Sequence, residues 1–210
     1  KGIADSWPQV SALVVQPGVE FGPDHVFTMA NATDPGLREA ISEYTDICLE
    51  AHSTDYQPPE TLAKLADMGF AFQKVGPALT FALRRALYAL DHIVQKLTPS
   101  EVALPQVMEA AMRNNPEHWR SHYSEDDMSK WHFSYADRIR YYWPLPAVQE
   151  AVQALISTFD ELKVPEHILA KSFSSDVLKR SEGLAVSRGR AIVRSEVQGA
   201  LLPYFLWDRG

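Results

Sequence analysis

The stretch Leu49-Glu50-Ala51-His52-Ser53-Thr54-Asp55-Tyr56-Gln57 decides the predicted fold of this chain. The segment over residues 46–51 predicts a β-strand that ends as this stretch begins to turn polar. Pro58-Pro59-Glu60, directly after it, predicts the start of a helix. The polar residues between them form a loop at the carboxyl end of the strand, so the sequence predicts one strand-loop-helix unit of an α/β fold.

Two similar units flank this one. A β-branched run over residues 11–16, closed by Pro17-Gly18, predicts a buried parallel strand, and apolar residues recur at helical spacing over residues 37–44. A third strand is predicted over residues 70–75, followed by a long helix over residues 76–98. Because strands and helices alternate, we expect a parallel sheet with right-handed crossovers.

The pattern changes at Pro99. Residues 99–210 contain apolar residues at helical spacing, separated by prolines, and predict no strand. A complete (β/α)8 barrel needs about 250 residues, so three units over residues 1–98 predict about half a barrel. Residues 99–210 are expected to form a mainly helical extension that packs on the barrel.

Composition and charge restrict the kind of partner. The 210 residues are 46% hydrophobic and carry a formal net charge of -7, with no clustered stripe of Lys and Arg, which disfavours nucleic acid and anionic membrane as partners. No apolar run approaches the roughly 18 residues of a membrane span. The single cysteine, Cys48, cannot form an internal disulfide and fits a reducing compartment. We expect a cytoplasmic protein that binds a small molecule or another protein.

Polar side chains gather at the ends of the three predicted strands. Because the carboxyl ends of parallel strands meet at one face, residues that follow these strands can share a site. The set comprises Gln16, Glu20, Glu50, His52, Ser53, Asp55 and Lys74. Carboxylates, an imidazole, a hydroxyl and a lysine suit proton transfer and phosphate binding, so the sequence predicts a sugar-phosphate site at this face.

Each of these residues also has a structural interpretation. Glu50 and His52 lie on the same side of a strand, which suits a metal or proton transfer and equally a hydrogen-bonded structural pair. Ser53 and Asp55 can bind substrate hydroxyls or cap the loop as turn residues. Lys74 can balance the charge of a phosphate or pair with Glu50. The sequence leaves these alternatives open.

Two further segments suit an anion. The turn Gly76-Pro77-Ala78-Leu79-Thr80 offers free N–H groups at the positive end of a helix, which makes Gly76, Ala78 and Thr80 candidate phosphate-binding residues. Residues 134–144 carry two arginines and three tyrosines, which could bind a phosphate or a partner's carboxylates through Arg138, with Asp137 holding one guanidinium. The same string is also typical of a packing device.

The chain resembles a known family in four segments that occur in order. They are VVQPGVEF (14–21), EAHSTDYQ (50–57), KVGPALTFALR (74–84) and DRIRYYWP (137–144). They are similar to the D-tagatose-1,6-bisphosphate aldolase subunits of the GatZ/KbaZ type, in the second half of those longer proteins. The resemblance implies an α/β fold: the C-terminal part of a TIM (β/α)8 barrel, with about three parallel strands and their helices, followed by a helical C-terminal extension.

The resemblance also implies a function. Members of the family are regarded as non-catalytic subunits that support the activity and stability of a class II aldolase catalytic subunit in galactitol, N-acetylgalactosamine or tagatose catabolism. That partner cleaves a sugar phosphate with a divalent metal such as zinc. The resemblance therefore implies that the metal is held mainly by the partner. It leaves open whether this chain also forms a homo-oligomer.

Single residues can be compared with the related catalytic subunits. His52, followed by Ser53, falls where those subunits carry a zinc-binding histidine at the end of the seventh strand. The sixth-strand histidine is not matched, and Glu20 is the one residue there that could donate to a metal. The residues from Gly76 to Thr80 fall at the turn that binds substrate phosphate. The resemblance implies an aldolase-type site with an incomplete set of metal ligands.

The leading hypothesis is thus an accessory subunit. The alternative is a stand-alone metal-dependent sugar-phosphate aldolase or epimerase, with Glu50 or Asp55 as proton carrier and Lys74 near the phosphate. A tagatose-6-phosphate kinase, an older label of the family, ranks below both because the sequence contains no P-loop. The third hypothesis is a protein that only binds other proteins and has no ligand site.

Overall fold

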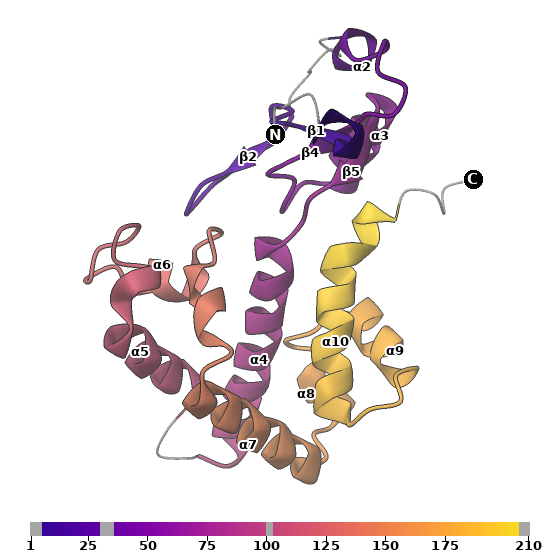
Figure 1. The fold of residues 1–210 in the computed structure, drawn as a ribbon. Coiled ribbons are helices and arrows are strands. Elements are labelled where there is room, and N and C mark those ends of the chain that lie inside the picture. The colour runs from indigo at the N-terminus through magenta and orange to yellow at the C-terminus, as the bar shows by residue number, and fades with distance from the viewer. Residues whose placement is uncertain (1–5, 30–35, 100–102, 206–210) are drawn as a thin grey trace. The chain divides into compact units, whose positions relative to one another are not determined.

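The computed structural model describes residues 6–29, 36–99 and 103–205 of the chain (Figure 1). The chain divides into two compact units, and each is described by itself. The first comprises residues 1–76 and 202–210, and the second comprises residues 77–201.

A three-stranded parallel sheet organises the first unit. It contains β1 (Ala12–Val15), β4 (Cys48–Ala51) and β5 (Phe70–Gln73), with β4 between the other two. The predicted parallel order of three strands is confirmed, although each strand is shorter than its predicted segment. Three parallel strands in one sheet, with a helical region after them, are the arrangement expected for part of a TIM-type barrel, so the predicted fold class is also confirmed.

Short elements complete the first unit. α3 (Pro59–Asp67) begins at the predicted prolines and buries Leu62 and Leu65, while α2 (Leu37–Ala40) is a single turn, shorter than the apolar spacing predicted. The remaining elements are η1 (Trp7–Gln9), η4 (Leu202–Tyr204) and an antiparallel hairpin of β2 (Glu20–Phe21) and β3 (Val26–Phe27). The sequence did not predict this hairpin, because two-residue strands are too short to show an alternating pattern.

Burial differs across the sheet, and β1 is exposed at Leu13, which is the partner of Leu49, as well as at Val14. Leu49 and Phe70 are paired neighbours in the sheet, and both are buried in a core that also contains Leu65 of α3. On the other face, Glu50 pairs in register with Val14 on one side and with Phe72 on the other. Val14 is 53% exposed and Phe72 is 55% exposed.

The sequence predicted that the first strand is fully buried, and this is wrong for β1 within the described residues of the first unit. β1 lies at an edge of the three-stranded sheet, so one side of the strand has no neighbouring strand among the described residues. The β-branched residues of this segment suggested burial, but the described residues of the first unit leave Val14 exposed.

The second unit is helical. Its long helix α4 (Pro77–Leu97) lies beside α10 (Arg188–Leu201), and α7 (Pro146–Leu162) packs against both of them and against α5 (Leu104–Asn114), as Figure 1 shows. The shorter elements are η2 (Pro116–His118), α6 (Met128–Phe133), η3 (Arg138–Tyr142), α8 (Glu166–Leu169) and α9 (Ser175–Glu182). No strand lies among the described residues after Pro99, as predicted.

The apolar spacing of α4 explains its place in this unit. Leu87, Leu90 and Val94 recur three or four residues apart and, together with Ala86, are buried in one hydrophobic core. Trp119 and Trp131 lie in the same core, with ring centroids 4.1 Å apart. Within the described ranges, no helix is both long and apolar enough to cross a membrane.

Candidate functional site

The loop between β4 and α3 has an uncommon backbone conformation. Ser53 has φ 56° and Tyr56 has φ 63°, both in the left-handed region that residues with a Cβ seldom adopt. Such a conformation costs free energy and persists only where surrounding contacts hold it. Both residues belong to the polar stretch that the sequence singled out.

Three buried polar side chains hold this loop. Thr54 is fully buried and its Oγ1 donates to the carbonyl oxygen of Lys74 at 2.7 Å. Asp55 is 3% exposed, and its Oδ1 accepts a hydrogen bond from the N–H of Gly76 at 2.9 Å. The Nε2 of Gln57 donates to the carbonyl oxygen of Phe27 at 3.1 Å. The loop is thereby joined to the segment that follows β5 and to the hairpin.

These contacts bear on the two interpretations of Asp55. Its carboxylate accepts a main-chain N–H and is almost fully buried, which is the geometry of a residue that holds a turn. A proton carrier needs a carboxylate that reaches a substrate. The burial of Asp55 thus favours the structural interpretation, and Ser53, whose side chain is partly exposed, is better placed to meet a ligand.

Glu50 and His52 form the hydrogen-bonded pair that their spacing predicts. The Nε2 of His52 lies 2.8 Å from Oε1 of Glu50, and each side chain is 29% exposed. This contact leaves Nδ1 as the ring nitrogen of His52 that is not engaged with Glu50. The pair lies on the sheet face that carries Val14 and Phe72, at the carboxyl end of β4.

Gln16 and Glu20 form a second local pair. The Nε2 of Gln16 donates to Oε2 of Glu20 at 2.6 Å, and the N–H of Phe21 donates to Oε1 at 3.0 Å. Glu20 opens β2 instead of lying in an unstructured loop after the first strand. Both carboxylate oxygens of Glu20 thus have hydrogen-bond partners.

The arrangement of donors can be tested against a zinc site. Zinc in proteins takes at least three protein ligands at about 2.0–2.3 Å. Among residues 6–29, 36–99 and 103–205, no group of three or more His, Cys, Asp or Glu side chains lies close enough to hold a metal ion. Glu50 and His52 supply two donors, so the described residues do not by themselves complete a zinc site.

Lys74 lies at the end of β5 with an exposed side chain. Its main chain is fixed, because its N–H donates to the carbonyl oxygen of Ala51 at 2.9 Å and its carbonyl accepts from Thr54. No ion pair between Lys74 and Glu50 is found in the part of the chain that the structure describes. A fixed backbone with an exposed ammonium group is suited to meeting an anionic ligand.

Three predicted phosphate-binding residues belong to the second unit. Ala78 and Thr80 lie in the first turn of α4, and Arg138 begins η3. Ala78 is buried, and Thr80 Oγ1 donates to Asp137 as well as to the carbonyl oxygen of Pro77. The Nε of Arg138 donates to the carbonyl oxygen of His118 at 2.6 Å. Thr80 and Arg138 therefore each make protein contacts in this unit.

A buried ion pair dominates this part of the second unit. Arg84 is 1% exposed, Asp137 is 1% exposed, and their side chains form a direct salt bridge. The guanidinium of Arg84 also lies 4.1 Å from the centroid of the Phe81 ring. Asp137 adopts φ 47°, in the left-handed region that Asp tolerates better than most residues.

Sequence reasoning placed Asp137 correctly as the holder of a guanidinium but expected an arginine of its own segment. The partner is Arg84, 53 residues earlier. A signal was present: Phe81 and Leu87, three residues before and after Arg84, place it on an apolar side of the helix, and a charge at such a position predicts a buried partner. The contact of Asp137 with Arg84 fits the interpretation of the segment 134–144 as a packing device.

Sequence reasoning missed a second buried network. The Oη of Tyr88 lies 2.7 Å from Nδ1 of His132, and Nε2 of His132 lies 3.1 Å from Oε1 of Glu109. Burial lowers the pKa of His132, with the neighbouring Glu109 opposing this shift. Burial also raises the pKa of Tyr88 well above its usual value. The imidazole is therefore neutral near pH 7 and accepts from the phenol while donating to the carboxylate.

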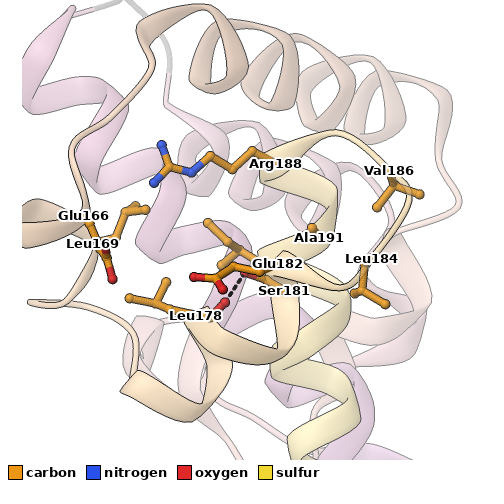
Figure 2. Close-up of a pocket in the computed structure, with 10 residues that line it drawn as sticks. Glu166, Leu169, Leu178, Ser181, Glu182, Leu184, Val186, Arg188 and Ala191 are labelled. Carbon is orange, nitrogen blue, oxygen red and sulfur yellow. Dashed lines mark hydrogen bonds between the residues drawn. The ribbon is translucent and has the colours of Figure 1, made fainter.

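A pocket of about 260 Å³ lies among α8, α9 and α10 (Figure 2). Its lining combines the charged side chains of Glu166, Glu182 and Arg188 with apolar ones that include Leu169 and Leu178. Ser181 Oγ donates to the carbonyl oxygen of Leu178 at 2.6 Å, so this hydroxyl is engaged with the main chain. None of the residues singled out from the sequence lines this pocket.

Comparison with known proteins agrees with the resemblance seen in the sequence. A family model described as "D-tagatose-1,6-bisphosphate aldolase subunit GatZ/KbaZ-like" matches residues 1–206. The chain is also similar to a solved structure from Sinorhizobium meliloti 1021, described as a probable tagatose 6 phosphate kinase, with 39% sequence identity and a TM-score of 0.86. The match covers 96% of this chain and 54% of that protein, so the chain spans about half the length of this relative.

Proposed function

The chain belongs to the D-tagatose-1,6-bisphosphate aldolase subunit GatZ/KbaZ-like family, and on that premise we propose that it acts in the accessory, non-catalytic subunit of a class II tagatose-1,6-bisphosphate aldolase. The subunit supports the activity and stability of a separate catalytic subunit, which holds the zinc ion. We further propose that the complex works in the cytoplasm, where Cys48 stays reduced.

The observation that supports this proposal most directly is the state of the candidate metal ligands. Glu50 and His52 are hydrogen-bonded to one another at 2.8 Å, and Glu20 is held by Gln16 and by a main-chain N–H. A catalytic zinc site needs three protein ligands that are directed toward one point. In this site the candidate ligands are hydrogen-bonded to one another or to the main chain. This fits a site that has kept the residue types of an aldolase but no longer binds the catalytic metal.

The same face can still bind a sugar phosphate. We propose that Lys74 contacts a phosphate group, that the open space beside Gly76 lets this group approach the main chain, and that Ser53 and Gln16 contact sugar hydroxyls. His52 and Glu20 remain the proposed metal-contacting residues if the site meets the metal of the partner. Ala78, Thr80 and Arg138 remain proposed phosphate-binding residues; they belong to the second unit, in the first turn of α4 and in η3.

We also propose that residues 1–98 are the last three β/α units of a TIM-type barrel and that residues 99–210 are its helical extension. The exposed apolar face of the sheet supports this arrangement, because Val14 and Phe72 would be covered in the interior of a closed barrel. A hollow of about 680 Å³ runs along β5, and its lining includes Phe70, Phe72 and Gln73. An edge strand with such a hollow is the place where a further strand would pair.

The experiment compares the full-length protein with and without a class II aldolase catalytic subunit. We expect no cleavage of D-tagatose 1,6-bisphosphate by the full-length protein alone. We expect a higher rate and a longer half-life of activity when it is added to the catalytic subunit. Full cleavage activity from this protein alone would refute the proposal. Light scattering of the same samples measures whether the protein binds a second copy of itself or the catalytic subunit.

A second function is favoured by one observation. The contact between Glu50 and His52 is also the geometry of a proton-transfer pair, in which a carboxylate orients an imidazole. A stand-alone aldolase or epimerase using Glu50, with Asp55 and Lys74 assisting, would bind stoichiometric metal and lose turnover in the His52→Ala variant. Metal analysis and a panel of sugar phosphates, with and without ATP, distinguish this function and a kinase from the accessory role.

A further inference from the structure

We infer that Tyr204 is a positioning residue for the loop between β4 and α3. This inference rests on the proposed function, because the loop carries His52 and Ser53, but the contacts that support it are independent of any ligand. Tyr204 lies at the end of η4, about 150 residues after the loop, in the part of the chain that belongs to the first unit. Nothing in the sequence pattern connects the two segments.

The contact itself is specific. The Oη of Tyr204 donates to the main-chain carbonyl oxygen of Thr54 at 2.7 Å. The same hydroxyl lies 3.4 Å from Oγ1 of Thr54, which donates its own proton to the carbonyl of Lys74. Thr54 is fully buried, so its carbonyl has few other partners: the N–H of Gln57 reaches it at a longer distance of 3.4 Å. Tyr204 therefore supplies the shorter of the two hydrogen bonds to this oxygen.

The loop needs such support because of its backbone. Thr54 directly follows Ser53 and lies two residues before Tyr56, and both of these residues have positive φ values. The hydrogen bonds of Thr54 and Asp55 to the segment after β5 fix one side of the loop. Tyr204 fixes the carbonyl between the two strained residues, and with it the direction in which Ser53 projects.

The hydroxyl of Tyr204 remains a donor over the whole physiological range. Burial, together with the nearby Asp55 carboxylate, raises the pKa of Tyr204 to about 12. The η4 turn also packs against α3, the helix into which the loop leads, so the segment that carries Tyr204 is held beside the loop. A phenol that is half-buried, protonated and directed at a main-chain carbonyl acts as a permanent hydrogen-bond donor.

The test uses the Tyr204→Phe variant of the full-length protein, which removes the hydroxyl and keeps the ring. Hydrogen exchange of the amides of residues 52–57 measures the loop, and calorimetry measures the dissociation constant for D-tagatose 1,6-bisphosphate. We expect exchange in the loop to become about fivefold to tenfold faster and binding to weaken by a similar factor, as expected for one net hydrogen bond. The melting temperature should change little.

The matched control is Tyr44→Phe, since Tyr44 also belongs to the first unit and is 48% exposed. It should leave exchange in the loop and ligand binding unchanged. A merely structural role of Tyr204 would lower the melting temperature while leaving the dissociation constant unchanged, and that result would overturn the inference. So would an unchanged exchange rate in the loop.

The two readouts also separate this inference from the proposed function. If the wild-type protein does not bind the sugar bisphosphate, the ligand assignment in the proposed function fails. Hydrogen exchange in the loop still decides whether Tyr204 positions it, because exchange needs no ligand. If no binding is seen in the wild type, faster exchange limited to residues 52–57 supports the inference and unchanged exchange overturns it.

Discussion

Breaking the ion pair between Arg84 and Asp137 should cost more stability than breaking any of the exposed pairs among the described residues. Both side chains are buried and in direct contact, and Thr80 donates to the same carboxylate. Replacing Arg84 with Met keeps most of the side-chain volume but leaves Asp137 as a buried charge without its cation. Breaking a buried pair in this way costs about 3–5 kcal/mol, which is a large part of the 5–15 kcal/mol that holds a typical domain together.

Urea denaturation of the full-length protein measures this cost. Trp119 and Trp131 are both buried in the core of the second unit, so their fluorescence reports on the unfolding of that unit. We expect the free energy of unfolding of Arg84→Met to fall by about 3–5 kcal/mol. The matched control is Arg120→Met, because Arg120 is 67% exposed in its pair with Glu125 and should cost less than about 1 kcal/mol.

A double variant distinguishes the buried charge from lost packing. In Arg84→Met with Asp137→Asn, both charges are absent, and Asn tolerates the left-handed conformation at position 137. Thr80 can still hydrogen-bond the amide. We expect the double variant to recover at least half of the stability lost in Arg84→Met, since replacing both partners of a buried pair is often nearly neutral. A loss below about 1 kcal/mol in Arg84→Met, or no recovery in the double variant, would contradict the reasoning.

Three further predictions concern other features of the described residues. Because burial lowers the pKa of His132, the unfolded chain binds its proton first as the pH falls below about 6.5. The free energy of unfolding should then decrease by up to about 1.4 kcal/mol per pH unit down to the folded pKa, and His132→Gln should reduce this slope in melts from pH 7.5 to 5. Gly69 ends α3 with φ 95°, so Gly69→Ala should destabilise the protein by about 1–2 kcal/mol in urea, whereas Gly183→Ala, which has ordinary φ, should change it little. Ser174 caps α9 by accepting the N–H of Val177 at 3.3 Å, and Ser174→Ala should cost about 1 kcal/mol; an unchanged denaturation midpoint would show that the cap does not act.

The elements that the sequence predicted well have strong local signals. α4 was predicted over residues 76–98 and spans Pro77–Leu97, because a long run of apolar residues at helical spacing stops before a proline. The strand order was recovered because strands and helices alternate along the first part of the chain. The hairpin of β2 and β3 was missed, since its pairing involves only four residues and depends on contacts between segments.

In the candidate site, too, the sequence predicted a contact between residues close in the chain but not the contacts between distant residues. The spacing of Glu50 and His52 predicted that they would face the same side, and the structure places them in contact. The contacts of Thr54 with Lys74 and Tyr204, and of Asp55 with Gly76, join residues from 20 to 150 positions apart. No local pattern predicts such contacts.

The sequence alone determined the alternation of strands and helices, the polar loop after β4 and the family to which the chain belongs, because periodicity, turn residues and motif order are properties of short segments. Only the tertiary structure decided what each polar residue contacts. Asp55 holds a main-chain N–H, Asp137 pairs with Arg84, and Tyr204 reaches the loop from the far end of the chain. The physical reason is that a buried polar group must find a partner, and folding, rather than position in the sequence, determines which partner is near.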